Sequence, residues 1–200
     1  MALLRAATPG DFGPVLETDR VLLRAPQMSD YPAWAELRAA SQDFLVPWEP
    51  LWAPDELSRA SFRRRIRHYL RDMREDMGYA LFVYDTKSTE LVGGVTLCNV
   101  RRGVTQSCTL GYWVGASYAR QGYMTAAVRA VVPFVFDSLE LHRLEAACLP
   151  TNTASMLLLE RVGFKREGLA RRYLRINGEW SDHVLYALLD TDPRGSENGG

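Results

Sequence analysis

The chain has 200 residues, 47% of them hydrophobic and 24% charged, and this composition is typical of one globular domain with a sizeable core. Lysine and arginine together number 24, as do aspartate and glutamate, so the chain lacks the overall basic charge that is typical of nucleic-acid binders. Three separate cysteines (Cys98, Cys108 and Cys148) form no CxxC pair, and no apolar run reaches the ~20 residues that span a bilayer, so we expect a cytoplasmic protein without a metal site.

The N-terminal part of the chain predicts one strand, one helix and a long loop. Residues 1–17 are interrupted early by proline and glycine, so we expect a flexible lead-in and no signal peptide. Residues 20–24 have the composition of a short strand, and residues 31–40 have the apolar spacing of a helix. The loop over residues 43–54, DFLVPWEPLWAP, contains three prolines and two tryptophans, which can anchor it to the core or line a peptide groove.

A second helix is predicted over residues 55–77 and is rich in arginine. Its apolar residues recur near the 3.6-residue period. The arginines are Arg59, Arg63, Arg64, Arg65, Arg67, Arg71 and Arg74. Such a local excess of positive charge can contact RNA or an acidic partner, although the simpler interpretation is a solvated helix face that Asp72, Glu75 and Asp76 partly neutralise.

The remainder of the chain alternates strands and helices. Strands are predicted over residues 79–84, 91–100, 105–114, 143–149, 164–173 and 180–189, and helices over residues 123–139 and 153–162. Asn177 and Gly178 form the strongest hairpin signal, and the polar tail of residues 191–200 is expected to be disordered. The order of the elements predicts one α/β (α+β) domain over residues 18–190, with helices on both faces of a mixed sheet.

Residues 110–125, LGYWVGASYARQGYMT, join the end of a predicted strand to the start of a helix. A helix start presents unpaired backbone N–H groups and the positive end of the helix dipole, which together suit a pyrophosphate. Gly122 would let the backbone approach the phosphates closely, and Arg120 would add a cation. The alternative interpretation is an ordinary strand-to-helix turn with an exposed arginine.

A second junction of this kind follows the strand predicted over residues 143–149. Asn152 and Ser155 stand at the start of the next helix, within PTNTASMLLLERVGF. Two strands that each lead into a helix N-terminus create a cleft between their carboxyl ends, where ligands of α/β proteins commonly bind. Either residue could instead be a simple helix cap.

Seven stretches, in this order, resemble the GCN5-related N-acetyltransferase (GNAT) family, and within it the RimJ and RimL branch of ribosomal-protein-alanine N-acetyltransferases. The stretches are TDRVLLR (18–24), DFLVPWEP (43–50), LGYWVG (110–115), QGYMTAA (121–127), LHRLEAACLPTN (141–152), LLERVGFKREG (158–168) and YLRINGEWSDHVLYAL (173–188). PWEP, HR and NGEWSDHVL look most like the RimJ type. The resemblance implies the GNAT fold, a mostly antiparallel twisted sheet of about seven strands with a splayed central strand pair.

The resemblance also implies that acetyl-CoA is the co-substrate. Its pantetheine arm would lie as an extra strand between residues 111–114 and 143–149, and a backbone N–H near Trp113 or Val114 would bind the thioester carbonyl. The implied cofactor-binding residues are Trp113, Val114, Arg120, Gln121, Gly122, Tyr123, Met124, Thr125, Asn152 and Ser155.

Two residues are expected to move protons. Ser155 would protonate the departing thiolate, because the position that holds a tyrosine in many family members is Leu159 here. Glu49, in the apolar PWEP loop, is the candidate general base, because the position of the RimL-like glutamate holds a leucine. Glu49 could instead fix the ammonium of the acceptor, in which case Asp182, Tyr173 or ordered water would be the base.

The acceptor implied by the resemblance is the α-amine at a protein N-terminus, with the fifth small-subunit ribosomal protein suggested by the RimJ type. The arginine-rich helix would then contact the ribosome, and the protein would be a monomer or homodimer. Two alternatives stay open. One is an acetyltransferase for a small amine, such as an aminoacyl-nucleotide, an amino acid or an antibiotic, and the other is a non-catalytic CoA-binding or ribosome-assembly module.

Overall fold

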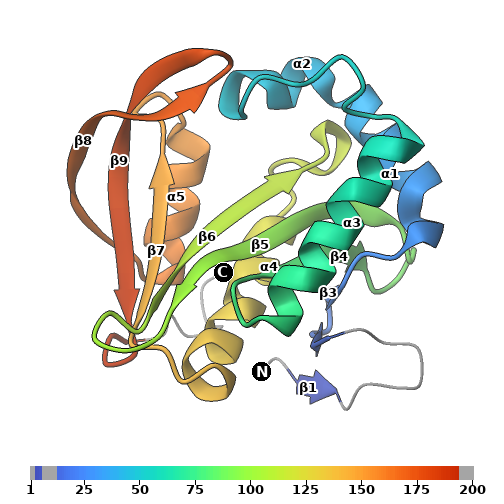
Figure 1. The fold of residues 1–200 in the computed structure, drawn as a ribbon. Helices are drawn as coiled ribbons and strands as arrows, with labels where there is room; N and C mark the ends of the chain where they lie inside the picture. The colour runs from blue at the N-terminus through green and yellow to red at the C-terminus, as the bar shows by residue number, and fades with distance from the viewer. Residues whose placement is uncertain (1–2, 6–12, 194–200) are drawn as a thin grey trace.

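The computed structural model describes residues 3–5 and 13–193 (Figure 1). The strands are β1 (Leu3–Arg5), β2 (Val15–Glu17), β3 (Val21–Arg24), β4 (Tyr79–Asp85), β5 (Leu91–Arg101), β6 (Ser107–Val114), β7 (Arg143–Cys148), β8 (Lys165–Ile176) and β9 (Glu179–Leu189). The α-helices are α1 (Tyr31–Ala40), α2 (Gln42–Leu45), α3 (Arg59–Arg74), α4 (Tyr123–Pro133) and α5 (Thr153–Val162). Short 3-10 turns are η1 (Met28–Asp30), η2 (Val46–Trp48) and η3 (Ala116–Tyr118), and a π-helical turn, η4 (Phe134–Ser138), follows α4.

The strands form one sheet in the order β1-β2-β3-β4-β5-β6-β7-β9-β8. Within the described part of the chain, β6 and β7 are the one parallel pair, and all other neighbours are antiparallel. The predicted mixed, mostly antiparallel sheet is therefore confirmed, with nine strands rather than about seven. The two additional strands, β1 and β2, come from the expected flexible lead-in of residues 1–17, where three-residue strands are too short to give an alternating pattern. Of the expected disordered tail, residues 194–200 lie outside the described residues.

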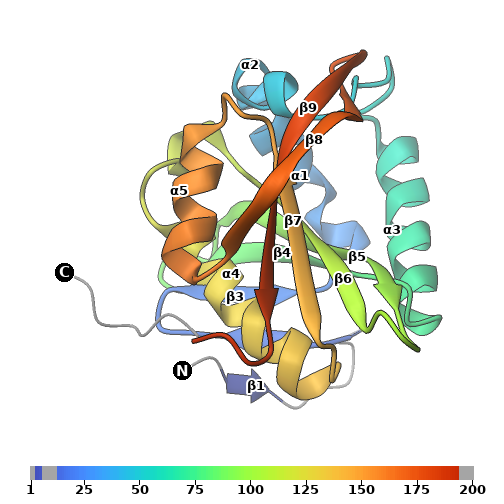
Figure 2. The same cartoon turned by 90° about the vertical axis from the view of Figure 1, so that its left-hand side faces the viewer.

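Helices cover both faces of the sheet, as expected. Figure 2 shows α4 and α5 on one side and α1 and α3 on the other. The larger core lies under α4 and α5 and includes Val128, Val131 and Leu159, all at most 1% exposed. The smaller core lies under α1 and α3, where the rings of Trp34 and Phe62 are 4.8 Å apart. The side chains of a given strand therefore alternate between two separate apolar layers.

Local signals explain several boundaries. Helix α3 begins at Arg59 rather than at residue 55, because Ser58 is its N-cap and accepts a hydrogen bond from the Ser61 N–H at 3.1 Å. The turn between β8 and β9 consists of Asn177 and Gly178, which have φ angles of 44° and 86°. Two positive φ angles are the requirement of a type I′ hairpin, so this predicted turn is confirmed.

The C-terminal end of α1 is fixed against the end of β6. A Cβ atom at Gly115 would lie 2.4 Å from Leu37 Cδ1, so any side chain here would require Leu37 to move. The buried Ser41 hydroxyl accepts a hydrogen bond from the Ala116 N–H at 2.9 Å. These contacts place α1 and the loop that follows it beside the region where β6 and β7 separate.

Candidate active site

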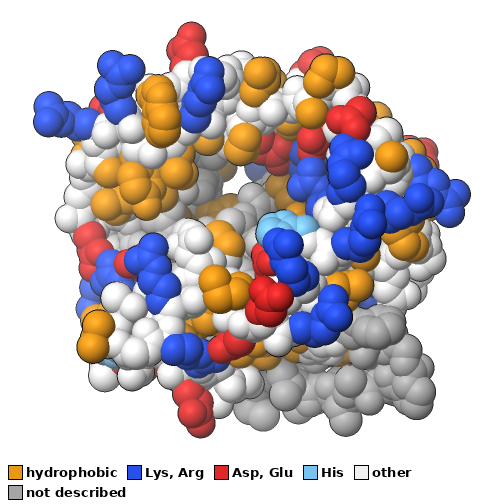
Figure 3. All heavy atoms as spheres, in the orientation of Figure 1, with side chains coloured by type: hydrophobic (Ala, Val, Ile, Leu, Met, Phe, Trp, Pro, Cys, Tyr) orange, Lys and Arg blue, Asp and Glu red, His pale blue; other side chains and the backbone are white. Residues whose placement is uncertain are grey.

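The centre of the sheet opens between β6 and β7. Their pairing runs only from Ser107 opposite Arg143 to Leu110 opposite Ala146, although β6 continues to Val114. Beyond this point the two strands diverge, as Figure 1 shows, and the surface in Figure 3 is hollowed between the β7–β9 side and the α1–α3 side. The splayed central strand pair expected from the resemblance is present.

The free edge of β6 presents particular backbone groups to this opening. Gly115 donates its N–H to the Val92 carbonyl at 2.9 Å, toward β5. N–H groups along an antiparallel strand alternate in direction. The backbone N–H of Trp113 therefore also points toward β5, whereas the backbone N–H groups of Tyr112 and Val114 point into the opening. Of the two residues considered for binding the thioester carbonyl, the ladder therefore favours Val114.

The loop before α4 has the backbone geometry of an anion site. Gly122 is the N-cap of α4 in a left-handed conformation, with φ 83° and ψ −2°, and no side chain caps the helix. The backbone N–H groups of the first turn thus remain available for a ligand. Arg120 also has a positive φ, 60°, and its side chain is exposed.

Other side chains of this loop bind within the protein. Gln121 Nε2 donates to the Ser117 carbonyl at 2.7 Å, the Tyr123 hydroxyl donates to Asp85, and Met124 is buried. Among the residues predicted to bind the cofactor, these three would therefore contribute backbone rather than side-chain groups. Thr125 is half-buried in the first turn of α4.

Arg20 adds a cation that sequence reasoning missed. Its guanidinium donates to the Gln121 carbonyl and lies 4.7 Å from the centre of the Tyr123 ring. Its Cζ atom would be 4.0 Å from a Cβ at Gly122. No sequence signal links β3 to a loop about 100 residues later, so only the fold reveals this neighbour.

A second group of polar side chains, the serine cluster, lies where the start of α5 meets the sheet and consists of Tyr112 of β6, Cys148 of β7 and Ser155 of α5. Asn152 Oδ1 accepts the Ser155 N–H at 3.1 Å, so Asn152 is the N-cap of α5. The hydroxyl groups of Ser155 and Tyr112 are 2.6 Å apart. Burial raises the pKa of both Tyr112 and Cys148 above their ordinary values, so both are neutral at physiological pH.

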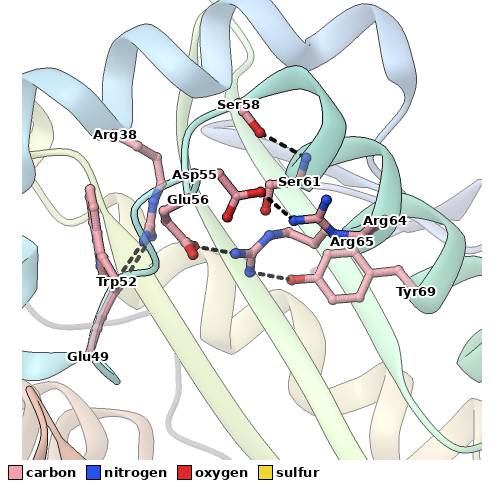
Figure 4. Close-up of polar contacts among 10 residues, drawn as sticks. All are labelled: Arg38, Glu49, Trp52, Asp55, Glu56, Ser58, Ser61, Arg64, Arg65 and Tyr69. Carbon is pink, nitrogen blue, oxygen red and sulfur yellow. Dashed lines mark hydrogen bonds and ion pairs between the residues drawn. The ribbon is translucent and has the colours of Figure 1, made fainter.

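Glu49 lies on the other face of the sheet in the arginine cluster, which consists of Arg38, Glu49 and Trp52 (Figure 4). Arg38 donates to both carboxylate oxygens at 2.8 and 2.6 Å, and Trp52 Nε1 donates to Oε2 at 2.8 Å. The Arg38 guanidinium also lies 4.5 Å from the centre of the Trp52 ring and 5.0 Å from that of Trp113. The cluster therefore connects the loop of residues 43–54 to β6.

Glu49 also connects two loops across the top of the opening. Its backbone carbonyl accepts the Asn177 N–H from the β8–β9 turn at 2.8 Å. The predicted acid and base are consequently separated: Ser155 belongs to the α5 face, and Glu49 to the α1 face. They can act on one substrate only through the gap between β6 and β7.

The other candidate positions have simpler surroundings. Leu159 is 1% exposed in the larger core, so this position supplies no proton donor here. Asp182 accepts the Arg172 N–H at 2.8 Å, and the Tyr173 ring lies 5.9 Å from that of His183. Over the described residues, no cluster of histidine, cysteine and carboxylate side chains is suitable for a metal ion, and no helix is long and apolar enough to cross a membrane.

Comparison with known proteins identifies close relatives. The acetyltransferase (GNAT) domain family matches residues 20–165. The probable N-acetyltransferase YjcK of Bacillus subtilis is 33% identical over 89% of this chain and 98% of its own length, and the ribosomal protein uS5-alanine N-acetyltransferase of Escherichia coli is 33% identical over 88% and 91%. The structure of Mycobacterium smegmatis RimJ in complex with CoA-disulfide has a TM-score of 0.80 and 34% identity, and the match covers 90% of this chain and 83% of that one.

Proposed function

The chain belongs to the GNAT acetyltransferase family, as an acetyl-CoA-dependent N-acetyltransferase of the RimJ and RimL type, and we propose that its acceptor is the N-terminal α-amine of a ribosomal protein. The observation that carries the proposal is the similarity over nine-tenths of the chain to an enzyme named for the alanine of ribosomal protein uS5. The arrangement of the opening supports it, because the gap between β6 and β7 gives an amine at a chain end access to the groups on both faces of the sheet.

The residues around the opening fit acetyl-CoA as the donor. Backbone N–H groups at the start of α4, with Arg120 and Arg20 beside them, would hold the pyrophosphate. The free edges of β6 and β7 would pair with the pantetheine amides, and Asn152 could donate through Nδ2 because its cap uses Oδ1. When bound, acetyl-CoA supplies an acetyl group activated as a thioester.

Protein groups on the α5 face would stabilise the charges that develop. The Val114 N–H would donate to the thioester oxygen as the amine attacks the carbonyl carbon. As the C–N bond forms and the C–S bond breaks, the Ser155 hydroxyl would give a proton to the departing thiolate. Tyr112 stays protonated, because burial raises its pKa, and its hydroxyl can donate a hydrogen bond to Ser155 Oγ across their 2.6 Å contact.

A base must remove the proton of the attacking amine, because a free α-amine with a pKa of about 8 is mostly protonated at neutral pH. Glu49 remains the predicted base. Its contacts with Arg38 and Trp52, however, favour the other role considered for it, a fixed negative charge that orients the acceptor's ammonium. In that arrangement Asp182, Tyr173 or ordered water would take the proton.

The test is thiol release from acetyl-CoA with three acceptors. The first is a peptide with the free N-terminal sequence of uS5, the second is the same peptide with a blocked α-amine and an internal lysine, and the third is a set of amino acids and aminoacyl-nucleotides. We expect turnover with the first alone and mass spectrometry to locate the acetyl group on its α-nitrogen. Faster turnover with the small amines would contradict the proposed acceptor while leaving the enzyme class intact.

A further inference from the structure

Helix α3 presents a stripe of positive charge to solvent. Its buried face is short and apolar, with Phe62 at 0% and Ile66 at 4% exposure. The outward face spans six exposed arginines: Arg59, Arg63, Arg64, Arg67, Arg71 and Arg74. Four of them recur at intervals of four residues, from Arg59 to Arg71, so their side chains follow one another about 6 Å apart along the helix.

Three arginines of α3 (Arg64, Arg65 and Arg71) are already paired, whereas others on the exposed face are not paired with any described residue. Arg64 binds Asp55, and Arg65, which is half-buried, binds Glu56 (Figure 4). Arg71 contacts His68 and Asp72 near the end of the helix. By contrast, Arg63 and Arg67 have no ion pair with any described residue. Figure 3 shows Lys and Arg side chains following the line of α3 in Figure 1.

The formal net charge of the chain is zero, so the exposed arginines of α3 are a local excess of positive charge. Three successive members of the row, Arg59, Arg63 and Arg67, have no ion pair with a described residue, and neighbouring like charges repel one another unless a partner of opposite charge covers them. The basic side chains of the helix that carry a fixed positive charge are arginines, whose planar guanidinium matches phosphate oxygens in a bidentate manner. We propose that the stripe formed by Arg59, Arg63, Arg67 and Arg71 binds the phosphate backbone of RNA.

The position of α3 relates this surface to the active site. The helix directly follows the loop that carries Glu49 and Trp52, and the ion pairs of Asp55 and Glu56 fasten that loop to it. RNA bound along α3 would therefore lie beside the part of the opening that is next to Glu49 and Trp52. A protein terminus that projects from an RNA-containing particle could reach the opening while its RNA rests on the stripe. The inference concerns binding alone and does not depend on which amine is acetylated.

The experiment measures binding of a fluorescent 20-base-pair RNA duplex to the full chain by anisotropy, at several salt concentrations and without acetyl-CoA. Replacing three stripe arginines (Arg59→Gln, Arg63→Gln and Arg67→Gln together) should weaken binding at least tenfold. The slope of log K against log salt should fall by about 1 for each phosphate contact that is lost.

The matched control removes the same charge from other exposed positions: Arg101→Gln, Arg161→Gln and Arg166→Gln together. It should bind RNA within a few-fold of the unmodified chain. A loss equal to that of the stripe variant would overturn the proposal, because only net charge would then matter. Unlabelled competitors give a second check. If a poly-glutamate peptide of equal charge displaces the fluorescent duplex as effectively as unlabelled RNA does, the proposal is overturned in favour of an acidic protein partner.

A third variant tests whether the substitutions simply damage the helix. Arg59→Lys, Arg63→Lys and Arg67→Lys together keep the charge and should retain the salt slope. If this variant loses binding as completely as the glutamine variant, the effect comes from the helix and the proposal fails.

Discussion

The serine cluster and the arginine cluster lie on opposite faces of the same sheet, at the same opening, and differ in how far their polar groups are satisfied. In the arginine cluster, both oxygens of Glu49 accept hydrogen bonds from Arg38, and Trp52 adds a third donor. In the serine cluster, two neutral hydroxyl groups share one contact between Tyr112 and Ser155. The first cluster fixes a loop, whereas the second retains a proton that it can give away.

This difference indicates that the serine cluster is better suited to proton transfer than the arginine cluster. A charged pair taken out of water must be fully satisfied, and disturbing either partner is costly. A pair of hydroxyl groups can exchange donor and acceptor roles with little rearrangement. The clusters should therefore respond differently to mutation, with loss of stability at Glu49 and loss of turnover at Ser155.

The largest expected effect is on stability at the arginine cluster. Glu49→Gln leaves the Arg38 charge buried without a counterion, since the two side chains are only 7% and 19% exposed. The free energy of unfolding should fall by about 3–5 kcal/mol, as measured by urea denaturation. Asp55→Asn, which breaks an ion pair whose side chains are 56% and 50% exposed, is the matched control and should change it much less.

The same variant separates the two roles of Glu49. If Glu49 is the general base, kcat should fall and the acidic limb of its pH profile should disappear. If Glu49 orients the acceptor, the acceptor KM should rise while kcat is largely retained. Unchanged kinetics in the folded fraction would contradict both roles.

The next effect is on turnover at the serine cluster. Ser155→Ala removes the proposed proton donor and should lower kcat by about 100-fold with little change in the affinity for CoA. Thr153→Ala, on the first turn of the same helix, is the control and should retain kcat. A Ser155→Ala enzyme with unaltered kcat would leave Asn152 and Ser155 with a capping role alone.

A smaller effect is expected on binding at the phosphate loop. Gly122→Asp adds a negative charge where the pyrophosphate is proposed to lie, so the Kd for CoA should rise more than tenfold, or about 1.4 kcal/mol. The control is Gly103→Asp. It also places an aspartate at a positive φ, since Gly103 has a φ of 67°, but in an open turn between β5 and β6. Calorimetry should find wild-type affinity in this control, and equal affinities in both variants would refute the assigned loop.

The smallest effect concerns the phenol of Tyr112. Tyr112→Phe removes one hydrogen bond, which should lower stability by about 1 kcal/mol, and kcat should fall only a few-fold because Ser155 remains. Tyr186→Phe removes a comparable contact with Glu160, 2.9 Å away, and serves as the control. A loss of kcat as large as that of Ser155→Ala would make Tyr112 the principal proton donor.

Sequence reasoning succeeded where the signal is local. The Asn177–Gly178 turn depends on two residues with positive φ, and the Asn152 cap of α5 depends on one side chain and one N–H three residues later. The start of α4 directly after Gly122 was likewise predicted, because a glycine that can adopt a positive φ precedes the helical pattern. Each of these features is determined within a few residues, so the chain order alone identifies it.

Long-range features could not be predicted in the same way. Arg38 has the position of an ordinary helix residue, and nothing in its neighbourhood indicates that it is 6% exposed between Trp52 and Trp113. Tyr112 reaches Ser155 only because β6 and α5 meet on the same face of the sheet. Such contacts depend on tertiary packing, for which the local pattern of a single sequence carries no information.

The early end of the ladder between β6 and β7 has a thermodynamic consequence. Beyond Leu110 and Ala146, the backbone groups of the two central strands no longer pair with each other and resemble those at the edge of a sheet. A ligand that pairs with them acts as the missing strand, so its binding energy adds to the folding energy of the domain. At a concentration 100 times its Kd, such a ligand raises the free energy of unfolding by about 2.7 kcal/mol, and amide hydrogen exchange at Tyr112 and Val114 should slow accordingly.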